Sequence, residues 1–257
     1  MEAKDRIIVA LDVGTPDEAI RLVEDLRSHV GCFKIGLQFI TAMLGSIIVP
    51  SLEGGQGAIY NLRRIRYLFE CLKGNILWDG KFDDIPNTVG AASGEVRKIG
   101  VKMFNVHGSC GIKAMRHAVA ESRDSLVLVV TVLTSLDENN ANLIFGGPSK
   151  AKVLQFARDA KLARCNGIIC SSQELEILGK EEELKDMIKV TPGIRPEWAQ
   201  TGDQKRVMTP YEAIRAGADY LVIGRPIRQP PESIGTPVDA AKKIAEEIET
   251  ALAEKGG

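Results

Sequence analysis

Short apolar runs alternate with amphipathic stretches along most of the chain. Eight runs have the length and composition of strands buried on both faces: 7–11, 32–35, 76–79, 103–106, 126–133, 167–170, 187–190 and 220–223. Apolar residues at helical spacing predict helices over 16–27, 91–98, 112–122, 149–162, 173–178, 209–216 and 238–253. Strands that alternate with helices pair in parallel through right-handed crossovers. Eight such units predict a closed (β/α)8 TIM barrel.

Two regions interrupt this alternation. Residues 44–58 contain Pro50 and a glycine-rich cluster at 54–57, and we expect a surface excursion there that lengthens the second βα unit. Residues 135–150 are polar and follow the fifth strand, and we expect a mobile lid there on the catalytic face. Composition does not shift along the 257 residues, and a barrel of this kind needs roughly 250. We therefore expect a single domain over 1–257.

The charge balance and the cysteines narrow the class of protein. The formal net charge is −1 and no long Lys/Arg run occurs, so the sequence indicates neither a nucleic-acid nor a membrane partner. No stretch reaches the ~20 apolar residues of a membrane span, and the charged residues 1–6 lack the apolar core of a secretory signal. The five cysteines include no C-x-x-C pair, which disfavours a disulfide framework and a zinc site, and Cys32 and Cys170 are expected in the core. We expect a cytoplasmic location.

Charged and polar residues follow several of the predicted strands. They are Asp12 after the first strand, Lys34 in the second, Asp79 and Lys81 after the third, His107 after the fourth, and Thr134 and Ser135 after the fifth. The strand ends of a barrel converge on one mouth, where the chemistry of this fold is found. Taken alone, Lys34 could extend to water and His107 could be a packed core residue. Their joint placement at the same end of successive strands favours a catalytic site.

The last two strands lead into residues suited to an anion. Arg195 and Gln204 lie in the loop after the seventh strand, and Gly224 and Arg225 follow the eighth. Backbone N–H groups beside a glycine approach a phosphate closely, and arginine binds it with two hydrogen bonds. Phosphate sites after strands seven and eight recur in this fold. The sequence therefore predicts a phosphorylated small-molecule substrate.

The most specific string in the chain is Asp-Gly-Lys-Phe-Asp-Asp-Ile-Pro-Asn-Thr at 79–88. A generic D-x-K-x-x-D would be no more than a solvated strand end with a salt bridge, but the whole string resembles the signature of the orotidine 5'-phosphate decarboxylases. Further strings of that family follow in the same order at 11–12, 33–36, 105–107, 132–135, 190–196, 202–204, 208–210 and 223–226, so the resemblance covers nearly the whole chain. Two features depart from it. Asp83 stands where many relatives have His, and 44–58 is longer than in the compact bacterial relatives.

The resemblance implies a role for each matched residue. Lys34, Asp79, Lys81 and Asp84 match the charged catalytic array of the family, with Asp84 supplied by the neighbouring subunit of a homodimer. Ile85 and Thr88 are implied to cross the same interface. Asp12 matches a ligand of the ribose hydroxyls and Thr134 a substrate contact. Arg195, Gln204, Gly224 and Arg225 match the phosphate-binding end.

The implied reaction is the decarboxylation of orotidine 5'-phosphate to UMP in pyrimidine biosynthesis, without cofactor or metal. It leaves a carbanion at carbon 6, and no motif for a cofactor electron sink is visible, so preorganised charges must stabilise it, with Lys81 placed to deliver the proton. One alternative is a magnesium-dependent 3-keto-gulonate-phosphate decarboxylase or hexulose-phosphate synthase, which carries Glu where this chain has Lys34. An ammonium there opposes a divalent cation. A second alternative, a non-catalytic phosphate-ligand binding protein, is disfavoured because all the charged residues are present.

Overall fold

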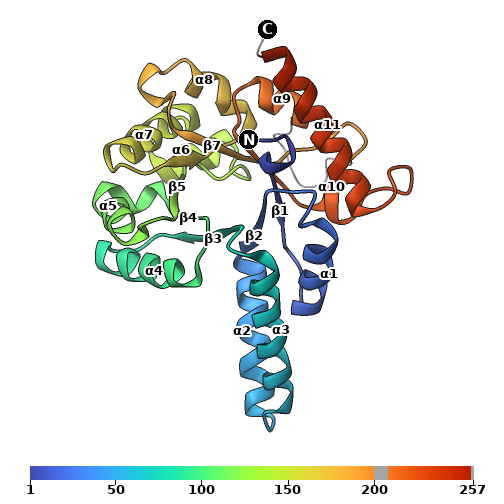
Figure 1. Cartoon of the computed structure of the whole chain (residues 1–257). Helices are drawn as coiled ribbons and strands as arrows, with labels where there is room; N and C mark the ends of the chain where they lie inside the picture. The colour runs from blue at the N-terminus through green and yellow to red at the C-terminus, as the bar shows by residue number, and fades with distance from the viewer. Residues whose placement is uncertain (200–207, 256–257) are drawn as a thin grey trace.

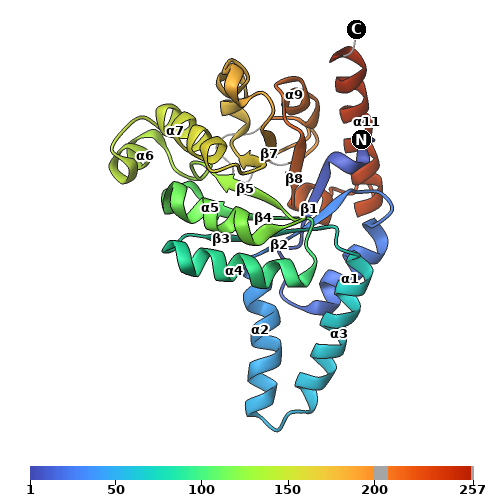
Figure 2. The same cartoon turned by 60° about the vertical axis from the view of Figure 1, so that its left-hand side comes forward.

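The computed structural model describes residues 1–199 and 208–255. These residues form a closed barrel of parallel strands that pair in chain order, surrounded by helices (Figures 1 and 2). The strands are β1 Ile7–Ala10, β2 Cys32–Gly36, β3 Ile76–Phe82, β4 Met103–His107, β5 Leu126–Val130, β6 Gly167–Ile169, β7 Ile188–Pro192 and β8 Tyr220–Ile223. The predicted (β/α)8 TIM barrel is confirmed, because each of the eight apolar runs contains or overlaps one strand.

The helices of the described residues lie between and after the strands. They are α1 Pro16–Leu26, α2 Leu37–Leu52, α3 Gln56–Leu72, α4 Pro86–Ile99, α5 Gly111–Ser122, α6 Glu138–Phe145, α7 Ser149–Leu162, α8 Leu175–Gly179, α9 Pro210–Arg215, α10 Arg225–Arg228 and α11 Pro237–Lys255. Local sequence sets several ends. The side chain of Thr15 accepts a hydrogen bond from the Glu18 N–H and Pro16 opens α1, while Gly100, with φ of 81°, ends α4. Within the described ranges, no helix is both long and apolar enough to span a membrane.

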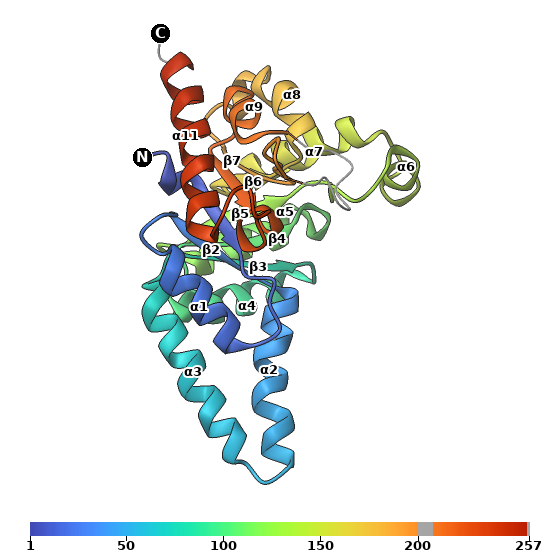
Figure 3. The same cartoon turned by 90° about the vertical axis from the view of Figure 1, so that its right-hand side faces the viewer.

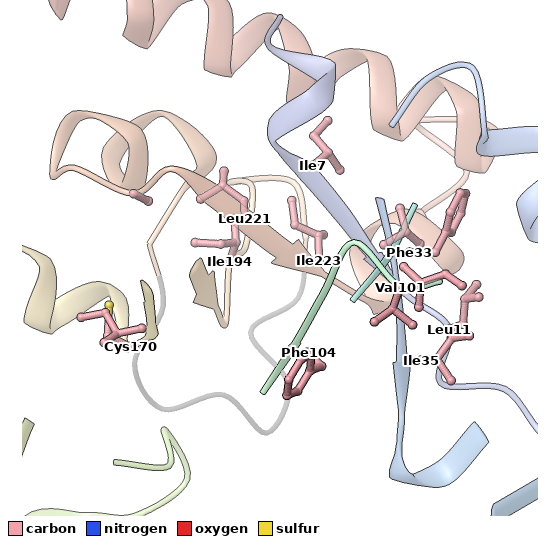
Figure 4. Packing of buried hydrophobic residues seen from close by; sticks show 14 of the residues in the cluster. Ile7, Leu11, Phe33, Ile35, Val101, Phe104, Cys170, Ile194, Leu221 and Ile223 are labelled. Atoms are coloured by element: carbon pink, nitrogen blue, oxygen red, sulfur yellow. The ribbon is translucent and has the colours of Figure 1, made fainter. Parts of the chain in front are cut away.

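The alternation of side chains along the strands divides the core into two clusters. Ile8 and Ala10 of β1 belong to the smaller cluster inside the barrel, with Cys32, Leu77, Met103, Leu128, Val190, Tyr220 and Val222. Ile7 and Val9 belong to the larger cluster between barrel and helices. Figure 4 shows Ile7 of this cluster together with Phe33, Ile35, Phe104 and Leu221. Both faces of each strand are therefore buried, which explains why the strands read as continuous apolar runs.

The two cysteines expected in the core are buried there. Cys32 lies in the barrel cluster and Cys170 in the outer one. Burial raises the pKa of the Cys32 thiol to about 12. The thiol therefore stays protonated near neutral pH and behaves as a small apolar side chain.

The second βα unit contains a helical hairpin that the sequence pattern did not predict. α2 and α3 run side by side and stand out from the barrel (Figures 1–3). Residues 44–58 lengthen the unit as expected, but they do so as the end of α2, a turn, and the start of α3. The turn uses Gly54 and Gly55, whose φ values are 110° and 87°. Pro50 lies in the last turn of α2 and does not prevent the helix.

One face of α2 is apolar and exposed. The helix has no charged residue between Leu37 and Leu52. Leu37, Leu44, Ile48 and Leu52 recur at helical spacing and are 54–83% exposed. We call these four residues the α2 stripe. The opposite face packs through Phe39 and Met43, which are buried.

Residues 135–150 contain α6, its connections and the start of α7. Asp137 accepts a hydrogen bond from the Asn140 N–H and begins the helix. Phe145 packs edge-on against Phe156 of α7, with 5.6 Å between ring centroids. Leu143 and Ile144 of α6 are exposed. Whether this segment moves as a lid stays a prediction.

Candidate active site

Four side chains of alternating charge form a row at the ends of β1, β2 and β3. Lys34 Nζ lies 3.1 Å from Asp12 Oδ1 and 3.3 Å from Asp79 Oδ2. Lys81 Nζ lies 2.7 Å from Asp79 Oδ1. The row therefore runs Asp12, Lys34, Asp79, Lys81, and each ammonium contacts a carboxylate. Sequence reasoning placed all four at the barrel mouth, and the structure brings them into contact.

Gly36 makes room for this row. It pairs with Asp79 across β2 and β3. A Cβ at Gly36 would lie 2.6 Å from Lys34 Nζ, so any side chain would displace the ammonium. Gly36 therefore leaves the space that the Lys34 ammonium occupies. Sequence reasoning did not single it out, although it closes the Phe-Lys-Ile-Gly string at 33–36.

Asp79 is held ionised by its neighbours. Its side chain is only 11% exposed, and that burial by itself raises the pKa of the carboxyl. The charges of Lys34 and Lys81, with hydrogen bonds from Lys81 and Asn105, outweigh burial and lower the pKa of Asp79 below its ordinary value. The carboxylate is thus charged throughout the neutral range, and an ammonium on each side compensates it.

The backbone at Lys81 departs from a regular strand. β3 continues past Asp79, its predicted end, and its register with β4 shifts between Trp78 and Phe82. Lys81 has φ of 47°, in the left-handed region that residues with a side chain rarely adopt. In a regular strand, Asp79 and Lys81 would share one face because side chains alternate with period two. That alternation does not apply across this bulge, yet the two side chains meet.

A largely apolar pocket adjoins the charged row. Lys34, Asp79 and Lys81 line it together with Leu77, Val130, Val132, Leu133, Thr134, Ile169, Cys170, Pro192 and Val222. β5 ends at Val130 instead of residue 133, and the chain beyond it turns into the pocket lining. The structure therefore places Thr134 within reach of a molecule bound beside the two lysines. Apolar walls with a few convergent charges are typical of a small-molecule site.

Three of the residues assigned to the array or its surroundings do not line this pocket in the described structure. Asp84, Ile85 and Thr88 are exposed, with Ile85 at 66%. Asp84 Oδ1 accepts a hydrogen bond from the Ile85 N–H at 2.7 Å. Pro86 then opens α4, which begins five residues before the predicted helix at 91–98. Asp84 is thus not part of the charged row within its own chain.

Arginines gather where β7 and β8 end. Burial, and then the nearby charge of Arg225, lower the pKa of Arg195. Burial also lowers the pKa of Arg228. The nearby charge of Arg225 lowers it further, and the charge of Asp12 partly opposes the change. Like charges brought together in this way favour an anion between them. Arg228 was not recognised from the sequence, and Gln204 lies outside the described residues.

Gly224 separates β8 from Arg225 and Arg228. A Cβ at Gly224 would meet Ala10 Cβ at 3.6 Å and Asp12 Oδ2 at 3.8 Å, which are ordinary contact distances. Packing within the chain therefore does not require glycine here. Close approach of a ligand to the backbone remains a physical reason for it.

His107 belongs to a hydrogen-bonded chain beside the mouth. Ser109 Oγ donates to Asp83 Oδ2 at 2.7 Å and lies 2.6 Å from His107 Nδ1. Burial lowers the pKa of His107, Asp83 opposes this change and Lys81 adds to it. His107 is therefore neutral near pH 7, and its contacts agree with its interpretation as a packed, hydrogen-bonded residue.

A (β/α)8 barrel with a charged row, an apolar pocket and an arginine cluster at the carboxyl ends of its strands has the features of barrel enzymes that act on small phosphorylated molecules. Comparison with known proteins makes this class specific. The chain belongs to the orotidine 5'-phosphate decarboxylase / HUMPS family, whose model matches residues 5–244.

Individual relatives agree along their full length. The chain is 40% identical to the orotidine 5'-phosphate decarboxylase of Heliobacterium modesticaldum, over 99% of this chain and 100% of that protein. It is 38% identical to the enzyme of the same name from Syntrophomonas wolfei, over 97% of this chain and 100% of that one. The crystal structure of orotidine 5'-phosphate decarboxylase from Lactobacillus acidophilus superimposes with a TM-score of 0.71 at 26% identity, covering 94% of this chain and 98% of that one. These findings confirm the resemblance inferred from the motifs.

Proposed function

We propose that this protein decarboxylates orotidine 5'-phosphate to UMP, in pyrimidine biosynthesis. The observation that carries the proposal is the row Asp12–Lys34–Asp79–Lys81, set beside an apolar pocket at the barrel mouth. The name of the matched family also includes HUMPS. The curated relatives above, however, are named orotidine 5'-phosphate decarboxylase, and this chain matches them over their full length.

The charged row suits a reaction that creates negative charge on carbon. Loss of carbon dioxide leaves an electron pair at carbon 6 of the pyrimidine, which no adjacent carbonyl delocalises. The Lys81 ammonium, held 2.7 Å from Asp79, offers a fixed positive charge for that pair and then a proton for it. Asp79 and Lys34 keep the ammonium charged and aimed, so little reorganisation accompanies the reaction.

The same geometry orients the substrate. We place the phosphate against Arg195 and Arg225, with Gly224 permitting close backbone approach and Gln204 completing the grip. Asp12 is assigned to the ribose hydroxyls and Thr134 to the pyrimidine side of the pocket. Binding energy gained at the phosphate, remote from carbon 6, is then available to hold the ring against Lys81.

The site is completed by a second copy of the chain in a homodimer. The exposure of Asp84 supports this, because the carboxylate stands outside its own pocket. Ile85, which follows β3, and the α2 stripe, which follows β2, are exposed apolar residues. Exposed apolar surface of this kind is typical of an interface between subunits. A two-fold arrangement would give each pocket the Asp84 of the other chain, with Ile85 and Thr88 beside it. The expected location of this dimer is the cytoplasm.

Metal independence separates this function from the magnesium-dependent alternative. Lys34 Nζ contacts carboxylates on both sides, Asp12 and Asp79, and so occupies the place between them that a divalent cation would need. Extensive dialysis against EDTA should therefore leave the loss of orotidine 5'-phosphate absorbance unchanged. A rate that falls and is restored by magnesium would assign the chain to the 3-keto-gulonate-phosphate decarboxylase or hexulose-phosphate synthase alternative.

The proposed contact between Arg225 and the substrate phosphate predicts a lower kcat/KM for Arg225→Ala. The change removes a charge-assisted contact worth roughly 1.5–3 kcal/mol, so kcat/KM should fall about 10- to 150-fold, mostly through KM. Steady-state kinetics with orotidine 5'-phosphate measure the effect. Arg158→Ala is the control, because Arg158 is an exposed arginine paired with Glu181 and Glu183. Equal kcat/KM for Arg225→Ala and the control would refute the phosphate assignment.

A further inference from the structure

Asn105 lies under the charged row and bonds to two of its members. It belongs to β4 and is fully buried. Its Oδ1 accepts a hydrogen bond from the Lys81 N–H at 2.7 Å, and its Nδ2 donates to Asp79 Oδ1 at 2.7 Å. The orientation of the amide follows from these partners, because a backbone N–H only donates and an ionised carboxylate only accepts.

The first of these bonds repairs a break in the sheet. Trp78 pairs with Phe104 and Phe82 with Val106, so residues 79–81 of β3 stand against the single residue Asn105 of β4. A bulge of this kind interrupts the ladder of backbone hydrogen bonds. The Lys81 N–H turns to the Asn105 side chain instead, while Lys81 itself adopts the unfavourable left-handed φ of 47°.

The second bond fixes the carboxylate. Asp79 Oδ1 receives both the Asn105 amide and the Lys81 ammonium, and Oδ2 faces Lys34. Rotation of the carboxylate would break contacts on both sides. One amide therefore constrains the backbone of Lys81 and the side chain of Asp79 together, and so the direction in which the ammonium points.

We propose that Asn105 is a positioning residue for the decarboxylation, which holds the Lys81 backbone and the Asp79 carboxylate in the arrangement that presents the ammonium to carbon 6. This inference rests on the proposed function. If Asn105 only satisfied buried hydrogen-bonding groups, its replacement would lower the stability of the fold but would not selectively lower kcat.

Three variants separate these roles. Asn105→Ala removes both bonds, and Asn105→Asp keeps an acceptor for the Lys81 N–H while it loses the donor to Asp79. Asn166→Ala is the control for the hydrogen bond: Asn166 is exposed, but its Oδ1 also accepts a backbone N–H of a neighbouring strand, that of Val127 at 2.8 Å, at the opposite end of the barrel. Thermal unfolding of each variant gives the stability loss to compare with the control.

Kinetics give the first readout. We expect kcat of Asn105→Ala to fall about 10- to 100-fold with little change in KM, since misplacing a reacting group by about 1 Å has effects of this size. The acid limb of its pH profile should move to higher pH, because the lost hydrogen bond had lowered the pKa of Asp79. Asn105→Asp should also lose kcat, since its carboxylate faces that of Asp79. A kcat loss no larger than that of Asn166→Ala, with an unmoved pH profile, would overturn the proposal.

A second readout does not depend on activity. The Lys81 amide should be protected from hydrogen exchange in the wild type and in Asn166→Ala, and lose that protection in Asn105→Ala. Equal protection in all three proteins would contradict the positioning role even if orotidine 5'-phosphate proved not to be the substrate. If Asn105→Ala fails to fold, Asn105→Asp is read in its place and should keep this protection while losing kcat.

Discussion

Replacing Lys81 by Ala should leave a folded barrel without measurable decarboxylation. The substitution removes both the charge that faces the developing electron pair and the proton that ends the reaction. Loss of a positioned acid commonly lowers the rate by at least ~100-fold, and loss of preorganised charge lowers it by a further ~100-fold or more. Asp79 keeps Lys34 and Asn105 as partners, so its charge is not left uncompensated and the fold should survive.

The matched control for this variant is Lys98→Ala. Lys98 Nζ also lies 2.7 Å from a carboxylate, that of Glu95, but on the exposed surface of α4. Both variants should keep the far-UV circular dichroism of the wild type, and only Lys81→Ala should lose turnover. Decarboxylation by folded Lys81→Ala within tenfold of the control would remove Lys81 from its assigned role.

Mixing two inactive variants should restore activity if Asp84 acts across a subunit interface. In a mixed dimer of Lys81→Ala with Asp84→Ala, one pocket receives both wild-type residues and the other receives neither. Random exchange makes roughly half of the dimers mixed, so activity should recover to roughly one quarter of the wild type. The expected signal is large because each variant alone is inactive.

A second mixture provides the control. Lys81 and Asp79 lie in the same pocket of one chain, 2.7 Å apart, so Lys81→Ala and Asp79→Ala should not complement when they exchange subunits. Subunit exchange is verified by mass measurement of differently tagged chains. Recovery in neither mixture, with exchange demonstrated, would show that Asp84 acts within its own chain or outside the site.

The barrel was predictable because its strands are buried on both faces and read as uninterrupted apolar runs. β3 was predicted too short, since Gly80 and Lys81 do not resemble strand residues and the bulge that includes them depends on contacts with β4. The hairpin of α2 and α3 was missed because Pro50 and the glycines at 54–57 indicated a break. In the structure, Pro50 falls in a final helical turn and Gly54 and Gly55 form the connection.

The charged members of the site were predictable for a related reason. Asp12 follows a predicted strand, Lys34 lies in one and Asp79 ends one, and a closed barrel brings the carboxyl ends of its strands together. Gly36 and Asn105 were not singled out, because their importance lies in the space and the hydrogen bonds that they give to other residues. The position of the Lys34 ammonium over Gly36 and the bulge opposite Asn105 both depend on how the strands pair, which the sequence alone does not give.

We propose that the charged row at the barrel mouth removes carbon dioxide from orotidine 5'-phosphate without a metal. The direct measurement uses protein purified from a host strain that lacks its own decarboxylase, dialysed against EDTA and given substrate labelled at the carboxyl carbon. We expect labelled carbon dioxide and UMP in equal amounts from the wild type and neither from Lys81→Ala. Folded wild-type protein that releases no label, or that releases it only after magnesium is added, would exclude metal-free decarboxylation of orotidine 5'-phosphate by this site.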